Sequence, residues 1–321
     1  MLAARAVRPA PDDPLSALEV ADAPAAAPPP GWVRVRVRAA ALNRHDLFSL
    51  AGVGLPAERM PMVLGCDAAG TTDDGAEVVV HAVVGDDDFR GDETLDPHRT
   101  LLSELHPGTL AEEVWVPRRN VLPKPAGWSA ERAASLGTAW LTAYRMLFTQ
   151  ARAVPGQTVL VQGAAGGVSN ALVVLGSAAG LRVWVTGRDP ERVARARSWG
   201  AAAGFAPGER LPARVDAVFE TVGKATWKHS VQSLVPGGTI VVAGATTGGD
   251  APAMLENVFF RQLRVLGSTM GTREEFQRLL SFCGSAGLEP EVDSVHALAD
   301  ARDAFARLHS GEAVGKVLVT V

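Results

Sequence analysis

The stretch Val159-Leu-Val-Gln-Gly163-Ala-Ala-Gly166-Gly167-Val168-Ser169 decides the fold of this chain. A short apolar run leads into a glycine cluster, which leads directly into a helix-forming run over 170–179. Gly163 permits a tight turn, and Gly166 and Gly167 let the backbone approach a pyrophosphate at the helix N-terminus. Glycines that serve only helix–strand packing are the alternative, because the spacing differs from the plain G-x-G-x-x-G fingerprint. The pattern favours a dinucleotide-binding turn that includes Val168.

The end of the next predicted strand, 181–186, indicates which dinucleotide is bound. A ribose-reading residue is expected about 20 residues beyond the first glycine, and an acidic one would repel a 2′-phosphate. This chain has Thr186, then Arg188, and Arg192 one helical turn later. A guanidinium suits a phosphate in geometry and charge, although solvated arginines are the alternative and Asp189 keeps NAD(H) possible. We predict that the protein prefers NADP(H).

Size and composition are typical of a two-domain enzyme with sizeable cores, since 47% of the 321 residues are hydrophobic. The net charge of −4 (31 basic and 35 acidic residues) predicts neither a nucleic-acid nor a membrane partner. Cys66 and Cys283 have no zinc-site spacing. The N-terminus lacks a signal-peptide core and no run is long enough to span a bilayer, so we expect a cytoplasmic protein.

The order of the predicted elements indicates an α/β protein. Residues 33–38 (Val-Arg-Val-Arg-Val-Arg) alternate as a half-buried strand does, and short strands continue to Leu122. From 123 to 269 strands alternate with helices, which implies a doubly wound parallel sheet. A helix over 299–308 and a strand over 316–321 follow. The expected parallel strands are 158–162, 181–186, 216–220, 238–244 and 264–268.

Many short motifs, in this order, resemble those of the medium-chain dehydrogenase/reductase superfamily over essentially the whole chain. The resemblance implies a GroES-like β domain over 1–122, completed by 270–321, and a Rossmann domain over 123–269. It also suggests a homodimer paired along 264–268. The matching motifs are Ala40-Ala-Leu-Asn-Arg-His-Asp-Leu47, Leu64-Gly-Cys-Asp-Ala-Ala-Gly70, Gly108-Thr-Leu-Ala-Glu112, Leu141-Thr-Ala-Tyr144, the glycine turn, Glu220-Thr-Val-Gly223, Pro236-Gly-Gly238, Gly244-Ala-Thr246, Gly267-Ser-Thr-Met-Gly271 and Gly315-Lys316.

The superfamily includes zinc enzymes and zinc-free reductases. At the three positions where zinc members carry their ligands, this chain has Asn43, Cys66 and Thr138. One thiol with an amide and a hydroxyl is a poor zinc site. The lobe that holds a structural zinc in such members, here 81–107, contains no cysteine. We therefore expect no zinc. The alternative is a metal held by Cys66, Asp67 or the histidines, among them His81, His98 and His106.

Without a Lewis acid, hydride transfer favours acceptors that delocalise the resulting negative charge. We therefore predict NADPH-dependent reduction of a quinone or an α,β-unsaturated carbonyl, as in the quinone oxidoreductase-like branch. A zinc-type alcohol dehydrogenase and a non-catalytic NADPH-binding sensor or structural protein are the alternatives. Asn43 and His45 are the expected catalytic residues, since they lie where zinc members hold a ligand and a hydroxyl relay, and Arg44 could hold an anionic group.

Further cofactor contacts are implied by the resemblance. Thr142 matches a position beside the nicotinamide, and Lys316 matches a lysine that points toward the cofactor. The other implied contacts lie at strand ends and are Gly244, Ala245, Thr246, Ser268, Thr269 and Met270. The segment between Ala201 and Val215 is too short for the helix that the superfamily usually carries there, which predicts a more open adenine side.

Overall fold

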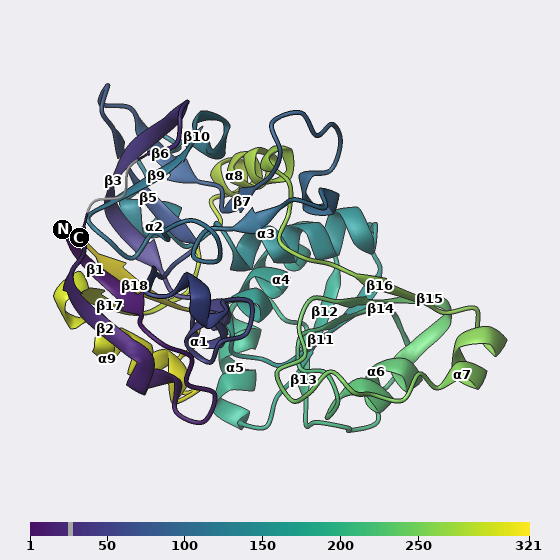
Figure 1. Cartoon of the computed structure of the whole chain (residues 1–321). Helices are drawn as coiled ribbons and strands as arrows, with labels where there is room; N and C mark the ends of the chain where they lie inside the picture. The colour runs from purple at the N-terminus through teal and green to yellow at the C-terminus, as the bar shows by residue number, and fades with distance from the viewer. Residues whose placement is uncertain (25–27) are drawn as a thin grey trace. The chain divides into compact units, whose positions relative to one another are not determined.

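The computed structural model describes residues 1–24 and 28–321, which form two compact units (Figure 1). The first unit comprises Met1–Ala139, Thr272–Ser285 and Glu289–Val321, so it is built from both ends of the chain. The second comprises Trp140–Gly271 with Ala286–Leu288. The first is a β-rich unit, as expected for a GroES-like domain, and the second is a parallel α/β unit. The predicted fold class is confirmed.

The first unit is organised around a seven-stranded sheet with the path β10-β6-β5-β3-β18-β17, and β9 also pairs with β3. The last strand lies antiparallel to β3, so the C-terminal segment completes the sheet. In β3 the expected alternation is present, with Val35 and Val37 buried and Arg36 and Arg38 exposed. The strands are β1 (Leu2–Ala6), β2 (Leu18–Asp22), β3 (Trp32–Ala41), β4 (Met62–Val63), β5 (Asp67–Thr72), β6 (Glu77–Val80), β7 (Val83–Val84), β8 (Thr100–Leu101), β9 (Glu113–Pro117), β10 (Val121–Pro123), β17 (Val292–Ala297) and β18 (Lys316–Thr320).

The helices of the first unit explain where it ends. They are α1 (Arg44–Leu50), α2 (Ala130–Ala134), α8 (Arg273–Ala286) and α9 (Ala301–His309). The sequence places the end of the first segment at Leu122, whereas the unit continues to Ala139. The reason is α2, which packs against β3 and β5. Its buried Ala133 and Ala134 belong to the core of the first unit, and this packing is not visible in the local pattern.

The second unit has a six-stranded sheet in the order β13-β12-β11-β14-β15-β16, and every pairing in it is parallel. Its core includes Leu160, Val218 and Ile240 from the three central strands. The strands are β11 (Thr158–Gln162), β12 (Arg182–Thr186), β13 (Ala203–Phe205), β14 (Val215–Glu220), β15 (Leu234–Val242) and β16 (Arg264–Gly267). The helices are α3 (Ala139–Tyr144), α4 (Gly167–Ala178), α5 (Pro190–Ser198), α6 (Trp227–Ser233) and α7 (Leu255–Phe260).

The five predicted parallel strands are present, with ends shifted by up to four residues. A sixth, β13, was not predicted because it is only three residues long, and it lies beside β12 at one edge. As expected, the segment between Ala201 and Val215 carries no helix. Among the described residues, none of the helices combines the length and the apolar character needed to cross a membrane.

Candidate functional site

The glycine turn joins β11 to α4. Gly163 has a φ of +90°, a left-handed conformation in which a side chain would be strained. α4 begins at Gly167, three residues earlier than predicted, and its N-cap Gly166 offers no side-chain acceptor. A side chain at Gly166 would have nothing within 4 Å, so the space before the helix is open. The first N–H groups of α4 are therefore suited to bind an anion.

The residues that were predicted to select the cofactor lie at and after the end of β12, in different environments. The buried Thr186 hydroxyl donates to Gln162 Oε1 at 2.6 Å, so it supports the turn from within. Arg188 is exposed and has no hydrogen-bond or ion-pair partner among the described residues. The Asp189 carboxylate caps α5 by accepting from Glu191 N at 2.9 Å, and it lies 3.3 Å from Arg192 Nε. Asp189 is thus committed locally, and Arg188 is available.

The other predicted cofactor residues of the second unit follow β15 and β16 or lie in α3. Gly244, Ala245 and Thr246 come directly after β15, and Ala245 and Thr246 are exposed. Ser268, Thr269 and Met270 follow β16, and Thr142 is buried in α3. Ser268 Oγ is buried without a hydrogen-bond partner among the described residues. An orphaned hydroxyl at the carboxyl end of a parallel strand is available to a ligand.

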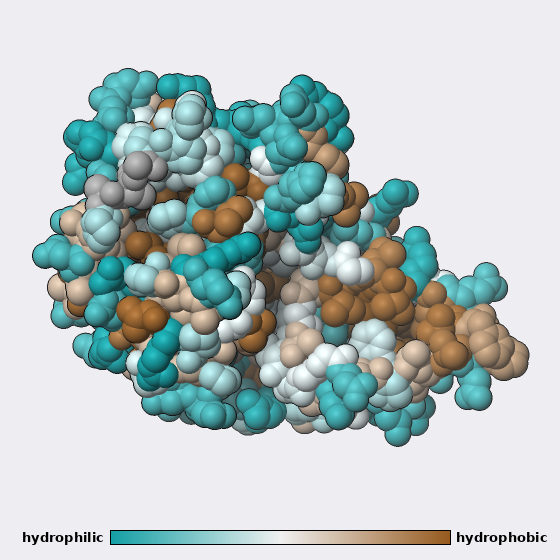
Figure 2. Space-filling model, viewed as in Figure 1, coloured by the Kyte–Doolittle hydropathy of each residue, from teal (hydrophilic) through white to brown (hydrophobic). Residues whose placement is uncertain are grey.

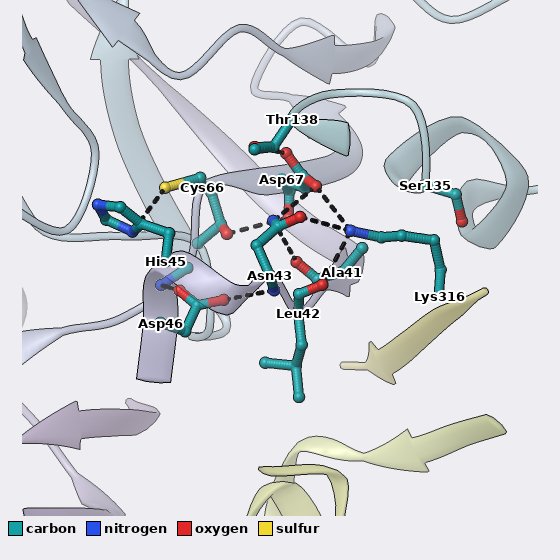
Figure 3. A network of polar contacts seen from close by, with 12 residues as sticks. Ala41, Leu42, Asn43, His45, Asp46, Cys66, Asp67, Ser135, Thr138 and Lys316 are labelled. Carbon is teal, nitrogen blue, oxygen red and sulfur yellow. Dashed lines mark hydrogen bonds and ion pairs between the residues drawn. The ribbon is translucent and has the colours of Figure 1, made fainter. Parts of the chain in front are cut away.

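In the first unit, Asp67 is the centre of a buried polar network (Figure 3). Its Oδ1 accepts from Thr138 Oγ1 at 2.5 Å, and its Oδ2 accepts from Asn43 Nδ2 at 2.8 Å. Lys316 Nζ lies 3.3 Å from the same Oδ2. Gly137 makes room for the carboxylate, since a Cβ there would be 2.5 Å from Asp67 Oδ1. Two loops and two strands therefore meet on one carboxylate.

Lys316, at the start of β18, has partners other than a cofactor. Its ammonium donates to Leu42 O at 2.8 Å and to Asn43 Oδ1 at 2.7 Å, besides the ion pair with Asp67. These contacts use its three N–H donors, and the side chain is only 2% exposed. Asn43 is equally committed, since its amide nitrogen also lies 3.3 Å from Ala41 O. In this structure both residues hold the network together.

His45 belongs to a neighbouring group with Cys66 and Glu104. Its Nε2 lies 3.0 Å from Glu104 Oε1, and its Nδ1 lies 3.6 Å from Cys66 Sγ, whose thiol donates to Leu102 O. Burial lowers the pKa of His45, but the Cys66 sulfur and the Glu104 carboxylate raise it, to about 11. Burial raises the pKa of the Cys66 thiol. The Glu104 carboxylate therefore favours the imidazolium form of His45, whose side chain is 20% exposed.

These residues do not fit a catalytic zinc. Asn43 and Thr138 direct their polar atoms to Asp67, whereas the Cys66 sulfur lies against His45 and Leu102. Three ligands that face different partners cannot coordinate one tetrahedral ion. Among the described residues, one group of His, Cys, Asp or Glu side chains is close enough to hold an ion, namely His45, Asp46 and Cys66.

In that group the Asp46 carboxylate is already occupied. One oxygen accepts from Asn43 N at 2.7 Å in the capping box of α1, and the other accepts from Gly65 N at 3.0 Å. Moving it toward a metal would expose two buried N–H groups without partners. Histidines 81, 98 and 106, which the sequence offers as alternative ligands, do not belong to it.

Sequence reasoning missed the roles of Glu104 and Asp67. Glu104 follows β8 and accepts from Leu101 N, and its local sequence gives no sign of a histidine partner. Asp67 did give a signal, because it is an acidic residue that opens a strand whose first four residues are buried. Such a carboxylate needs a partner. The partner, Lys316, is 249 residues away in sequence.

Comparison with known proteins identifies the family. Residues 29–126 match the alcohol dehydrogenase GroES-like domain, and 167–285 match the zinc-binding dehydrogenase domain. A crystal structure of an NAD-dependent alcohol dehydrogenase is 32% identical, with a TM-score of 0.93 and full coverage of both chains. A cobalt- and zinc-bound thermostable alcohol dehydrogenase from Pyrobaculum aerophilum is 30% identical, with a TM-score of 0.91, over 100% of this chain and 99% of that one.

A quinone oxidoreductase from Pseudomonas aeruginosa is 28% identical and covers 94% of this chain and 95% of its own length. The chain belongs to the medium-chain dehydrogenase/reductase superfamily, which consists of NAD(P)-dependent oxidoreductases. The predicted superfamily is therefore confirmed.

Proposed function

We propose that this protein is an NADPH-dependent reductase that transfers a hydride to a quinone or an α,β-unsaturated carbonyl without a metal. The main support is the arrangement of Asn43, Cys66 and Thr138, at the positions where zinc members of the superfamily carry their ligands. Asn43 and Thr138 hydrogen-bond to Asp67, and Cys66 lies against His45, which supports a site that works without a Lewis acid. An acceptor whose charge delocalises onto oxygen needs only alignment and hydrogen-bond donors. Similarity to a quinone oxidoreductase supports this branch.

NADPH is proposed as the hydride source because the groups that would bind its phosphates are available to a ligand. A side chain at the N-cap Gly166 of α4 would meet nothing within 4 Å, and the Arg188 guanidinium at the end of β12 has no partner among the described residues. Asp189, which could otherwise accept from a ribose, is committed to capping α5. When bound, NADPH supplies the hydride. Ser268 Oγ, which is buried and has no hydrogen-bond partner in the part of the chain that the structure describes, is a further candidate contact.

His45 is proposed to provide the proton that follows hydride transfer. The imidazolium is held by Glu104 on one nitrogen and by the Cys66 sulfur on the other. Its partial exposure allows exchange of the proton through the Glu104 side, where the carboxylate is 24% exposed. Asn43 then acts as a positioning residue, because its amide groups are all engaged.

We also propose that the protein is a homodimer. β16 is the edge strand of the second unit's sheet, and on one side it pairs with no other strand of the described residues. Large apolar side chains gather beside that edge, over α7 and β16 (Figure 2). An unprotected apolar edge is a site for pairing with a second copy. The exposed residues are Leu255, Phe259, Phe260 and Val265.

The proposal is tested by following NADPH oxidation with benzoquinone, naphthoquinone and cyclohexenone, before and after dialysis against a chelator. We expect turnover that is unchanged by chelation, with little oxidation of simple alcohols by NADP⁺. Stoichiometric zinc whose removal abolishes activity would favour the alternative, a zinc-type alcohol dehydrogenase, for which the His45, Asp46 and Cys66 group is the supporting observation. NADPH binding without turnover of any acceptor would favour a sensor.

A further inference from the structure

We propose that the Lys316 ammonium is a tethered monovalent cation, which fills a cation site built from the Leu42 carbonyl, Asn43 and Asp67. This inference does not depend on the reductase activity. The three oxygens around Lys316 Nζ lie at 2.8 Å, 2.7 Å and 3.3 Å. Figure 3 shows them converging on the ammonium from two segments of the chain. A lysine ammonium has three N–H donors, and each has an oxygen here.

The oxygens form a site that would exist without the lysine. Leu42 and Asn43 lie between β3 and α1, and the capping box of Asn43 and Asp46 fixes this junction. Asp67 is held independently by Thr138, with Gly137 leaving space for its carboxylate. Lys316 enters from β18, a strand distant in the sequence. The oxygens are therefore positioned by contacts other than those with the ammonium.

The charge of the site selects a monovalent cation. Two of the oxygens are neutral, from a carbonyl and an amide, and the third belongs to one carboxylate. A single positive charge balances this set, whereas a divalent ion would leave excess charge in a site where Asp67 is fully buried. A set made of oxygens alone also lacks the sulfur and nitrogen ligands that zinc prefers. The lysine thus supplies the cation of a site that includes Asn43, one of the three positions where zinc members of the superfamily carry their ligands.

The experiment removes the tether and supplies the cation from solution. In Lys316→Ala the ammonium and its stem are lost, which leaves space at the oxygens. In the matched control, Lys316→Met, an apolar side chain still fills the space of the lysine stem but the charge is absent. Thermal unfolding of both variants and of the wild type is followed in ammonium, potassium and tetramethylammonium chloride at equal ionic strength.

We expect the melting temperature of Lys316→Ala to rise saturably with ammonium or K⁺, by at least about 2 °C over tetramethylammonium. Lys316→Met and the wild type should show no difference between the salts. Lys124→Ala serves as a second control, because that lysine pairs with the exposed carboxylate of Glu77 at 3.4 Å outside such a site. Equal melting temperatures of Lys316→Ala in all three salts would overturn the proposal.

A second pair of variants keeps the test decisive if Lys316→Ala does not fold. Lys316→Met leaves the buried Asp67 carboxylate without a counter-charge, and Asp67→Asn leaves the lysine ammonium without one. The double variant is neutral, so we expect it to melt above both single variants. A double variant no more stable than the less stable single variant would contradict charge compensation at this site.

Discussion

Replacing Arg188 with alanine is expected to weaken NADPH binding selectively. The guanidinium is exposed at the end of β12 and has no hydrogen-bond or ion-pair partner in residues 1–24 and 28–321, so an effect of its loss on binding reflects the ligand. A charge-assisted hydrogen bond contributes about 1.5–3 kcal/mol, and each 1.4 kcal/mol corresponds to about tenfold in Kd. Because an exposed pair is screened by salt, we expect the lower end, a rise of about 10-fold in the NADPH Kd.

The assay is titration of nucleotide fluorescence with both cofactors at low and high salt. We expect the NADH Kd to change less than about twofold, since that ligand lacks the 2′-phosphate, and the NADPH effect to shrink at high salt. Arg192→Ala is the comparison, because its guanidinium already lies 3.3 Å from Asp189 and should matter less. An equal loss of affinity for NADH and NADPH in Arg188→Ala would refute a role in binding the phosphate.

Three further variants probe the network, the histidine and the dimer. Gly137→Ala would place a Cβ 2.5 Å from Asp67 Oδ1. We expect a loss of about 1–3 kcal/mol in the free energy of unfolding, measured with urea. An unchanged midpoint would argue against a tightly packed network. Burial lowers the pKa of His45, but Cys66 and Glu104 outweigh it and raise the pKa from 6.5 to about 11. The protonated histidine therefore stabilises the folded state fully below pH 6.5, and this stabilisation declines as the pH rises toward 11. The melting temperature of the wild type minus that of His45→Gln should therefore fall steadily above pH 6.5, and a difference that grows with pH would contradict the assignment. Phe260→Asp places a charge in the apolar surface at α7 and should shift the protein to a monomer in light scattering, whereas an unchanged mass would remove this surface from the interface.

Much of the fold could be predicted from the sequence because local patterns determined it. β11 begins and ends at the predicted residues, since an apolar run stops at a glycine with positive φ. The alternation in β3 was equally clear. By contrast, β13 is too short to have a pattern, and the boundary at Ala139 depends on how α2 packs.

The sequence by itself determined the superfamily and the elements that surround the glycine turn. It also predicted that Asn43, Cys66 and Thr138 make a poor zinc site. Only the tertiary structure decided what those side chains do instead. The ion pair of Lys316 and Asp67 joins residues 249 positions apart. The physical reason is that helix and strand patterns report short-range periodicity, whereas the partner of a buried charge is set by which distant strands become neighbours.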